Sequence, residues 1–204
     1  MNRRLTIFAI LFIFVLQNIA YSQNSPGKSQ SGKTSLDNMI YADTLNPAAP
    51  SQLTAFSFLV GDWTCDVRLR QADGSFIHWS AEWIGRYILE GYAIMDQYKM
   101  LDTTGKLVVS GFNIRSFNSK TNSWNMKWFE ALTSTWLDLG PQQLGGVEIS
   151  ESSITFKTQY APDEIQRIKF FNISKAHFDW KADISNDNGR VWKDSDILIS
   201  AHRK

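Results

Sequence analysis

The chain has 204 residues, with 21 lysines and arginines against 20 aspartates and glutamates. Such a balance offers no electrostatic footprint for nucleic acid or anionic membranes, so neither is expected as a partner. The single cysteine, Cys65, cannot close an intramolecular disulfide, so a packed core must hold the fold. Its apolar neighbours in a predicted strand indicate a buried, unreactive thiol.

Residues 1–22 show the three parts of a secretory signal peptide. Arg3 and Arg4 precede an apolar run at 5–16, and Ala20-Tyr21-Ser22 supplies small residues for a signal peptidase. The apolar run is shorter than a bilayer-spanning helix needs, although an uncleaved anchor is the alternative. Cleavage near Ser22 predicts an exported protein, periplasmic or secreted, without further membrane contact.

Residues 23–52 are predicted to be a flexible linker. It contains GKSQSGKT at 27–34, which fits the phosphate-binding pattern G-x-x-x-x-G-K-[ST]. No buried strand precedes this motif to deliver it to a helix, so the match is interpreted as accidental. Ser, Gly, Gln and Asn dominate the segment, a composition that favours a flexible tether. Within it, LDNMIYADTL at 36–45 could form a short helix or an ordered lid.

Residues 53–204 are long enough for one domain, and frequent aromatic residues and turn signals favour an all-β fold. The first hairpin turns at Asp73-Gly74. A simple two-residue turn there would set Leu69 opposite His78, so a bulge at Gly74 is predicted to restore apolar matching.

A turn at Leu89-Glu90-Gly91 begins a run of strands with one shared inner face. The pairing predicted across it sets Trp83 opposite Asp96. The inner face continues through the next two strands and carries Trp79, Ala81, Trp83, Tyr87, Tyr92, Asp96, Tyr98, Met100, Gly111, Asn113, Arg115, Phe117, Trp124, Met126 and Trp128. The opposite face is predicted to meet water, because it carries Glu82, Arg86, Gln97, Lys99, Ser110, Ser116, Asn125 and Lys127.

The last hairpin turns at Asn188-Gly189, where both positions tolerate positive φ. Its predicted register sets Trp180 opposite Ile197 on an apolar face and Lys181 opposite Asp196 on a charged one. Further strands are predicted in STWLDL, GVEIS, SITFKTQY and IQRIKFFNI. About ten antiparallel strands hide their edges best in an up-and-down β-barrel, which leaves room for a small ligand.

FSFLVGDWTCDVRLR resembles the opening of lipocalin-like (calycin) barrels, where a G-x-W motif begins the first strand. The resemblance implies that Trp63, two residues after Gly61, closes the barrel floor. The ordered set FLVGDW, WIGRYILEGYAIMDQY, GFNIRSFNSKTNSWNMKW, ITF and FDWKADISNDNGRVWK is similar to an exported family known as domain of unknown function fifteen-seventy-nine. This resemblance covers about residues 56–203. It implies the barrel fold, and it does not imply any particular activity.

The inner face predicts a small-molecule site, because aromatic side chains there share it with a few polar groups. The predicted ligand-binding residues are Trp79, Trp83, Asp96, Tyr98, Asn113, Arg115, Trp124 and Trp128. Asp96 and Arg115 are diagonal neighbours on adjacent strands, so a structural ion pair is an equal interpretation, and the two roles can coexist.

Three alternatives stay open. Related haem-binding barrels called nitrobindins hold haem through one histidine near the C-terminus, which suggests His202 as a haem ligand. The residues around His202 do not match the nitrobindin pattern, and alternation places His202, His78 and His177 on the outer face. A weak hydrolase or isomerase could use Asp96 with Glu130. A filled barrel could serve only as an interaction module. No nucleophile motif or metal-ligand spacing is present, so the sequence predicts no cofactor, no metal and, on balance, no enzyme.

Overall fold

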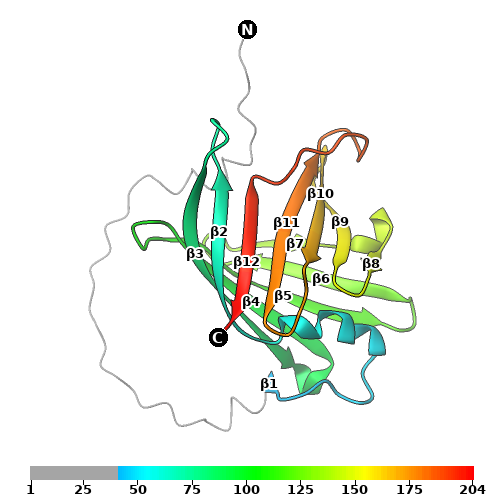
Figure 1. The fold of residues 1–204 in the computed structure, drawn as a ribbon. Helices are drawn as coiled ribbons and strands as arrows, with labels where there is room; N and C mark the ends of the chain where they lie inside the picture. The colour runs from blue at the N-terminus through cyan, green and yellow to red at the C-terminus, as the bar shows by residue number, and fades with distance from the viewer. Residues whose placement is uncertain (1–40) are drawn as a thin grey trace. The chain divides into compact units, whose positions relative to one another are not determined.

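The computed structural model describes residues 41–204. Figure 1 shows an almost wholly antiparallel sheet that curls around an interior, with the segment η2 across one end. The predicted signal peptide, the GKSQSGKT segment and most of the predicted linker lie outside the described residues. The predicted domain boundary after residue 52 falls inside η2, which spans Ser51–Leu59.

The twelve strands belong to one sheet. Their bounds are β1 Tyr41–Ala42, β2 Gly61–Arg70, β3 Phe76–Ile88, β4 Ala93–Leu101, β5 Leu107–Asn118, β6 Ser123–Glu130, β7 Thr135–Asp138, β8 Val147–Ile149, β9 Ile154–Ala161, β10 Glu164–Phe171, β11 His177–Ser185 and β12 Ile197–Arg203. Two short 3₁₀ segments, η3 Leu89–Gly91 and η4 Pro141–Leu144, lie between strands. No helix among the described residues is long and apolar enough to span a membrane.

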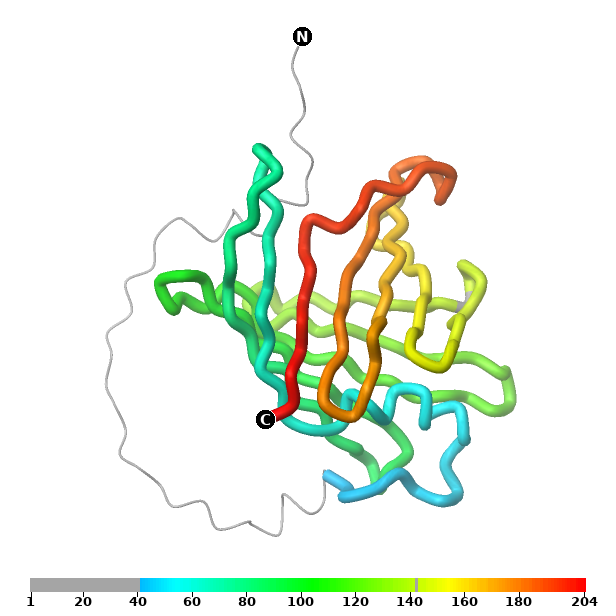
Figure 2. Tube along the Cα trace, viewed as in Figure 1, coloured from blue at the N-terminus to red at the C-terminus, as the bar shows by residue number. Residues whose placement is uncertain are grey.

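The strands follow the up-and-down order that the sequence predicts. Neighbours in sequence pair along both arms of the sheet, and β12 returns to pair with β2. Figure 2 traces this path. The sheet ends at β7 and β8, and η4 lies between these strands in the chain. Within residues 41–204, β7 and β8 share no ladder, so the wall of the barrel is interrupted at this point.

The predicted inner and outer faces are correct within the strands, but Tyr92, predicted on the inner face, lies before β4 and is 43% exposed. Two predicted registers are wrong by two residues. Trp83 lies opposite Tyr98 rather than Asp96, because the turn at η3 is longer than predicted and pairing resumes only at Ile88↔Ala93. Trp180 lies opposite Ile199 rather than Ile197. Side chains alternate with period two, so a two-residue shift leaves every side chain on its predicted face.

The bulge predicted at Gly74 is present. Gly74 has a φ of 85°, its N–H donates to the carbonyl of Gln71, and the N–H of Gln71 donates to the carbonyl of Ser75. These two bonds set two residues, Gly74 and Ser75, against one, which is a G1 bulge. The register that results pairs Leu69 with Ile77, as apolar matching requires.

The segment η2 covers one end of the interior. Leu53, Phe56 and Leu59 recur every third residue, so a 3₁₀ helix places them on one face, and all three are fully buried. The Phe56 ring packs edge-on against Trp124 of β6 at 5.0 Å between centroids and against Phe170 of β10 at 6.2 Å. These contacts join opposite walls of the barrel, so η2 closes this end.

The G-x-W motif lies beside η2. Trp63 is fully buried and donates its indole N–H to the carbonyl of Leu59 at 3.0 Å. The Arg203 guanidinium stacks 4.2 Å from the Trp63 ring centroid. Gly61 has a φ of 138°, and a Cβ there would collide with the Arg203 side chain. The motif therefore fixes the start of β2 against the end of β12.

The outer face carries an aromatic row as well as polar residues. Phe112, Phe129 and Trp136 occupy directly paired positions on β5, β6 and β7, and their rings contact one another. Trp136 is 54% exposed. The eight polar residues named for this face do lie on it, and this aromatic row, which the prediction did not name, lies among them.

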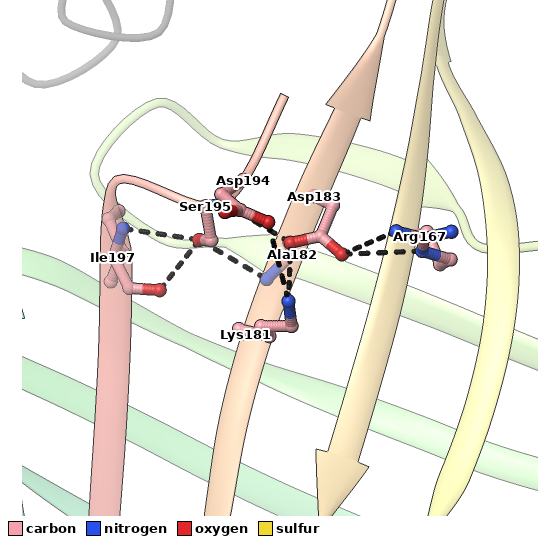
Figure 3. Close-up of polar contacts among 7 residues, drawn as sticks. All are labelled: Arg167, Lys181, Ala182, Asp183, Asp194, Ser195 and Ile197. Atoms are coloured by element: carbon pink, nitrogen blue, oxygen red, sulfur yellow. Dashed lines mark hydrogen bonds and ion pairs between the residues drawn. The ribbon is translucent and has the colours of Figure 1, made fainter. Parts of the chain in front are cut away.

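A buried carboxylate fastens the loop 186–196 to the outer face of β10 and β11 (Figure 3). Asp183 is 1% exposed and accepts hydrogen bonds from Arg167 Nη2 at 2.8 Å and from the backbone N–H of Ser195 at 3.1 Å. Lys181 Nζ lies 2.9 Å from Asp183 Oδ1, the oxygen that also accepts from Ser195. Within the loop, Asn188 and Gly189 both have positive φ, as the sequence predicts.

The short strand β1 lies in residues 41–45, the described part of the segment that could form a helix or lid. Tyr41 pairs with Ile88 and Ala42 with Tyr87 of β3, so this part of the segment is extended rather than helical.

Candidate ligand-binding site

Six of the eight predicted site residues are buried, and four of them form one polar group. Asp96 is fully buried on β4 and accepts hydrogen bonds from Trp83 Nε1 and Asn113 Nδ2, each at 2.9 Å. Its second carboxylate oxygen forms an ion pair with Arg115 of β5. The diagonal placement predicted for Asp96 and Arg115 is correct, because Asp96 lies opposite Asn113 and Arg115 opposite Ile94.

Arg115 lies beneath η2. Its side chain is 2% exposed, and its guanidinium lies 5.2 Å from the Phe56 ring centroid and 6.0 Å from that of Phe170. Among residues 41–204, its Nε has no hydrogen-bond partner. Burial lowers the pKa of Arg115 to about 9, which still leaves the guanidinium charged at neutral pH. Aromatic faces and the Asp96 carboxylate stabilise this buried cation.

Tyr98 and Trp124 pack into the same half of the interior. The Tyr98 ring lies 5.1 Å from that of Trp83, and its hydroxyl contacts Met100 Sδ at 3.5 Å. Burial raises the pKa of Tyr98 well above its usual value. Trp124 packs between Phe56 and Phe117. This half of the interior, near η2, is therefore filled by side chains.

Trp79 and Trp128, the other two predicted residues, are only half-buried although they face inward. Trp128 lies across Gly111 of β5, where a Cβ would come within 2.5 Å of its indole ring. Gly111 therefore lets this ring lie along the inner wall rather than stand away from it.

Half-burial with inward parity recurs on strands on both sides of the interrupted wall. Glu130 on β6, Tyr160 on β9 and Trp180 on β11 have inward parity and are also half-buried. A side chain that faces the interior and keeps solvent contact must border a space that admits solvent. We call this region the distal interior. It lies in the half of the barrel away from η2 and is defined by Trp79, Trp128, Glu130, Tyr160 and Trp180.

The Glu130 carboxylate acts on the Tyr160 hydroxyl across the interrupted wall. Burial raises the pKa of Glu130, whereas hydrogen bonds from the backbone of Leu132 and Ser110 lower it by less. The Leu132 N–H lies 3.1 Å from Glu130 Oε1. Burial also raises the pKa of Tyr160, and the charges of Glu164 and Glu130 add to this shift. Glu130 and Tyr160 therefore lie within electrostatic reach, although they come from β6 and β9 on opposite sides of the gap.

Sequence reasoning named Glu130 only as a carboxylate for catalysis and did not include Tyr160 or Trp180 in the site. Parity alone places Trp180 inward, and that signal was available in the sequence. Its partial exposure depends on how other side chains fill the interior, which no local pattern reports. The Asp96–Arg115 pair, in contrast, follows directly from strand register.

The three histidines lie on the outer face, as their parity predicts. His78 is paired with Asp66 at 2.9 Å, and His177 with Asp179 at 3.2 Å. His202 lies opposite His177, with 4.8 Å between ring centroids. Within residues 41–204, no group of three or more His, Cys, Asp or Glu side chains is arranged to hold a metal ion. Cys65 is buried and free, and burial raises its pKa to about 12.

Comparison with known proteins supports the fold. No family model matches the chain, and no curated protein matches it. Among solved structures, it is similar to Rv2717c from M. tuberculosis, with 11% identity and a TM-score of 0.50, over 76% of this chain and 99% of that one. It is also similar to the S-type phycobiliprotein lyase CPES from Guillardia theta, with 9% identity and a TM-score of 0.47, over 76% and 93%.

Rv2717c has a lipocalin-like barrel fold. The strand order, the inner-face parity and the likeness to Rv2717c agree with one another. The described domain is therefore a lipocalin-like β-barrel.

Proposed function

We propose that this protein binds a small, partly apolar molecule in the distal interior. The observation that supports the proposal is the contrast between the two halves of the inner face. Near η2, Trp63, Trp83 and Trp124 are at most 6% exposed. In the distal interior, Trp79, Trp128 and Trp180 face inward and remain accessible to solvent. Accessible aromatic faces with a few polar groups are typical of small-molecule sites.

In this proposal the Asp96–Arg115 pair supports the site and does not contact the ligand. Both groups are covered by η2 and its neighbours, so a ligand could reach them only if Phe56 moved. The pair fixes Trp83 and Asn113 through Asp96 and so holds β3, β4 and β5 together. The ligand would contact Trp79 and Trp128 of the predicted set, together with Tyr160 and Trp180.

A thermal-shift screen against a library of small metabolites tests this proposal. Ligands that raise the melting temperature of the wild type should lose that effect in Trp128→Ala and in Trp180→Ala. Trp136→Ala is the matched control, because this tryptophan lies on the outer face. The proposal fails if no metabolite gives a shift, or if the inner-face variants keep shifts of wild-type size.

A second candidate is a weak acid–base enzyme. Glu130 is better suited to this role than Asp96, because it is half-buried beside the accessible space, and burial raises its pKa. Turnover of a bound metabolite that Glu130→Gln abolishes, while binding persists, would favour catalysis over simple binding.

We also propose that the protein is exported. The basic start, apolar run and small residues at 20–22 carry this proposal. Mass spectrometry of the mature protein should find an N-terminus near residue 23. An intact Met1 on protein recovered from the cytoplasm would contradict export.

A further inference from the structure

Charge is distributed unequally between the two faces of the barrel. In the described strands, lysines and arginines have outward parity except Arg115 and Arg203. Both exceptions lie at the end closed by η2, and both guanidinium groups already have partners there. Arg115 is paired with Asp96, and Arg203 stacks on Trp63 while donating to the carbonyls of Val60 and Phe58.

The distal interior carries a carboxylate without a cationic partner. Among residues 41–204, no lysine, arginine or histidine lies within ion-pair distance of Glu130. Its hydrogen bonds come from the backbone of Leu132 and Ser110. Burying a carboxylate without a counter-charge is costly, so a cation placed beside Glu130 would be stabilised.

The aromatic residues of the distal interior favour the same kind of ligand. The faces of Trp79, Trp128 and Trp180 carry the negative side of the ring quadrupole, and a cation near an indole face gains free energy, more so away from bulk water. The Tyr160 hydroxyl can accept a hydrogen bond from a charged nitrogen.

The loops at the distal strand ends add a weaker, longer-range effect. Loops 71–75, 102–106, 162–163 and 186–196 together carry six aspartates against three lysines and arginines. An excess of negative charge around an entrance raises the local concentration of cations. The entrance and the interior therefore favour the same sign of ligand.

We propose that the ligand of the distal interior carries a positively charged nitrogen, held between tryptophan faces and the Glu130 carboxylate. This inference rests on the proposed function, because it gives the chemical class of the molecule bound there.

Three probes of similar size test the charge. Trimethyl(3-phenylpropyl)ammonium is the cation, 3-phenylpropan-1-ol the neutral molecule and 4-phenylbutyrate the anion, each titrated calorimetrically into the full-length mature protein. The cation should bind at least about tenfold more tightly than the anion. Glu130→Gln should weaken binding of the cation by about tenfold and leave binding of the alcohol unchanged.

Glu148→Gln is the matched control, because Glu148 is exposed on the outer face of β8 and should leave all three affinities unchanged. Far-ultraviolet circular dichroism and urea unfolding verify that Glu130→Gln folds. Anion or alcohol binding as tight as that of the cation overturns the inference. The inference is also overturned if every library ligand that binds the distal interior is neutral or anionic. In both cases the proposed function stands, whereas the complete absence of binders defeats the proposed function itself.

Discussion

Arg115 of β5 forms a fully buried ion pair with Asp96 of β4, diagonally across neighbouring strands. The same carboxylate accepts hydrogen bonds from Trp83 and Asn113. A buried pair of this kind is expensive to form, and it is more expensive to break when one charge remains. The arrangement thus gives the half of the barrel near η2 a single rigid centre.

Removing one member of the pair should destabilise the protein strongly. Asp96→Asn and Arg115→Met are each expected to lower the free energy of unfolding by about 3–5 kcal/mol, because each leaves a buried charge unpaired. The double variant should lose less than the sum of the single losses. Urea unfolding measures all three. Strictly additive losses would show that the two residues do not act as a pair.

Phe56 closes the end of the barrel, so its truncation should leave a cavity. Phe56→Ala is expected to cost about 3–5 kcal/mol of unfolding free energy. Gln52→Ala, an exposed change in the same segment, should cost less than about 0.5 kcal/mol. Equal losses in the two variants would mean that η2 does not depend on the buried Phe56 ring.

Gly111 allows Trp128 to lie along the inner wall. Gly111→Ala places a Cβ against the Trp128 ring and the Phe129 carbonyl, so the indole should move, at a cost of about 1–3 kcal/mol. The ¹H–¹⁵N signal of the Trp128 indole should shift in this variant. Ser110→Ala, one residue earlier and on the outer face, should leave it in place. An unchanged indole signal in Gly111→Ala would refute the described position of Trp128.

Asp183 should make stability depend on pH in the acid range. Burial opposes its ionisation, but hydrogen bonds from Arg167 and Lys181 outweigh burial and hold its pKa below the usual value. The unfolded chain therefore takes up the proton first as pH falls. The stabilisation is complete above about pH 4 and is lost as pH falls through the lower folded-state pKa.

The variant Asp183→Asn isolates this effect. At about pH 6 it should be less stable than the wild type by about 1.5–3 kcal/mol, and this difference should shrink steadily below about pH 4. Urea unfolding at a series of pH values measures the difference. A gap that stays constant down to about pH 2 would assign the loss to packing rather than to charge.

Strand positions and faces could be predicted because side chains alternate between the two faces of a strand. This alternation stays correct when the predicted length of a turn is wrong by two residues. The turn after β3 shows the limit. Leu89 and Glu90 both have positive φ, a conformation that neither residue type signals, so the loop is longer than its sequence suggests. Pairing shifts by two residues, and Asp96 still faces inward.

The rest of the site depends on contacts that no local pattern encodes. The spacing of Leu53, Phe56 and Leu59 indicates one buried face, but not that this face covers Arg115 across the barrel. Tyr160 and Glu130 come from strands separated by the interrupted wall, and only the curl of the sheet brings them within reach. The aromatic row at Phe112, Phe129 and Trp136 lies among the polar residues of the outer face, and its ring contacts depend on how β5, β6 and β7 pair.

The indole N–H spectrum tests the proposed site most directly, because the eight tryptophans of this chain sample both halves of the interior and the outer face. The strongest ligand from the metabolite screen is titrated into ¹⁵N-labelled protein. The signals of Trp79, Trp128 and Trp180 should shift, while those of Trp63 and Trp136 should stay in place. Shifts confined to Trp136, or a spectrum that does not change at saturating ligand, would contradict binding in the distal interior.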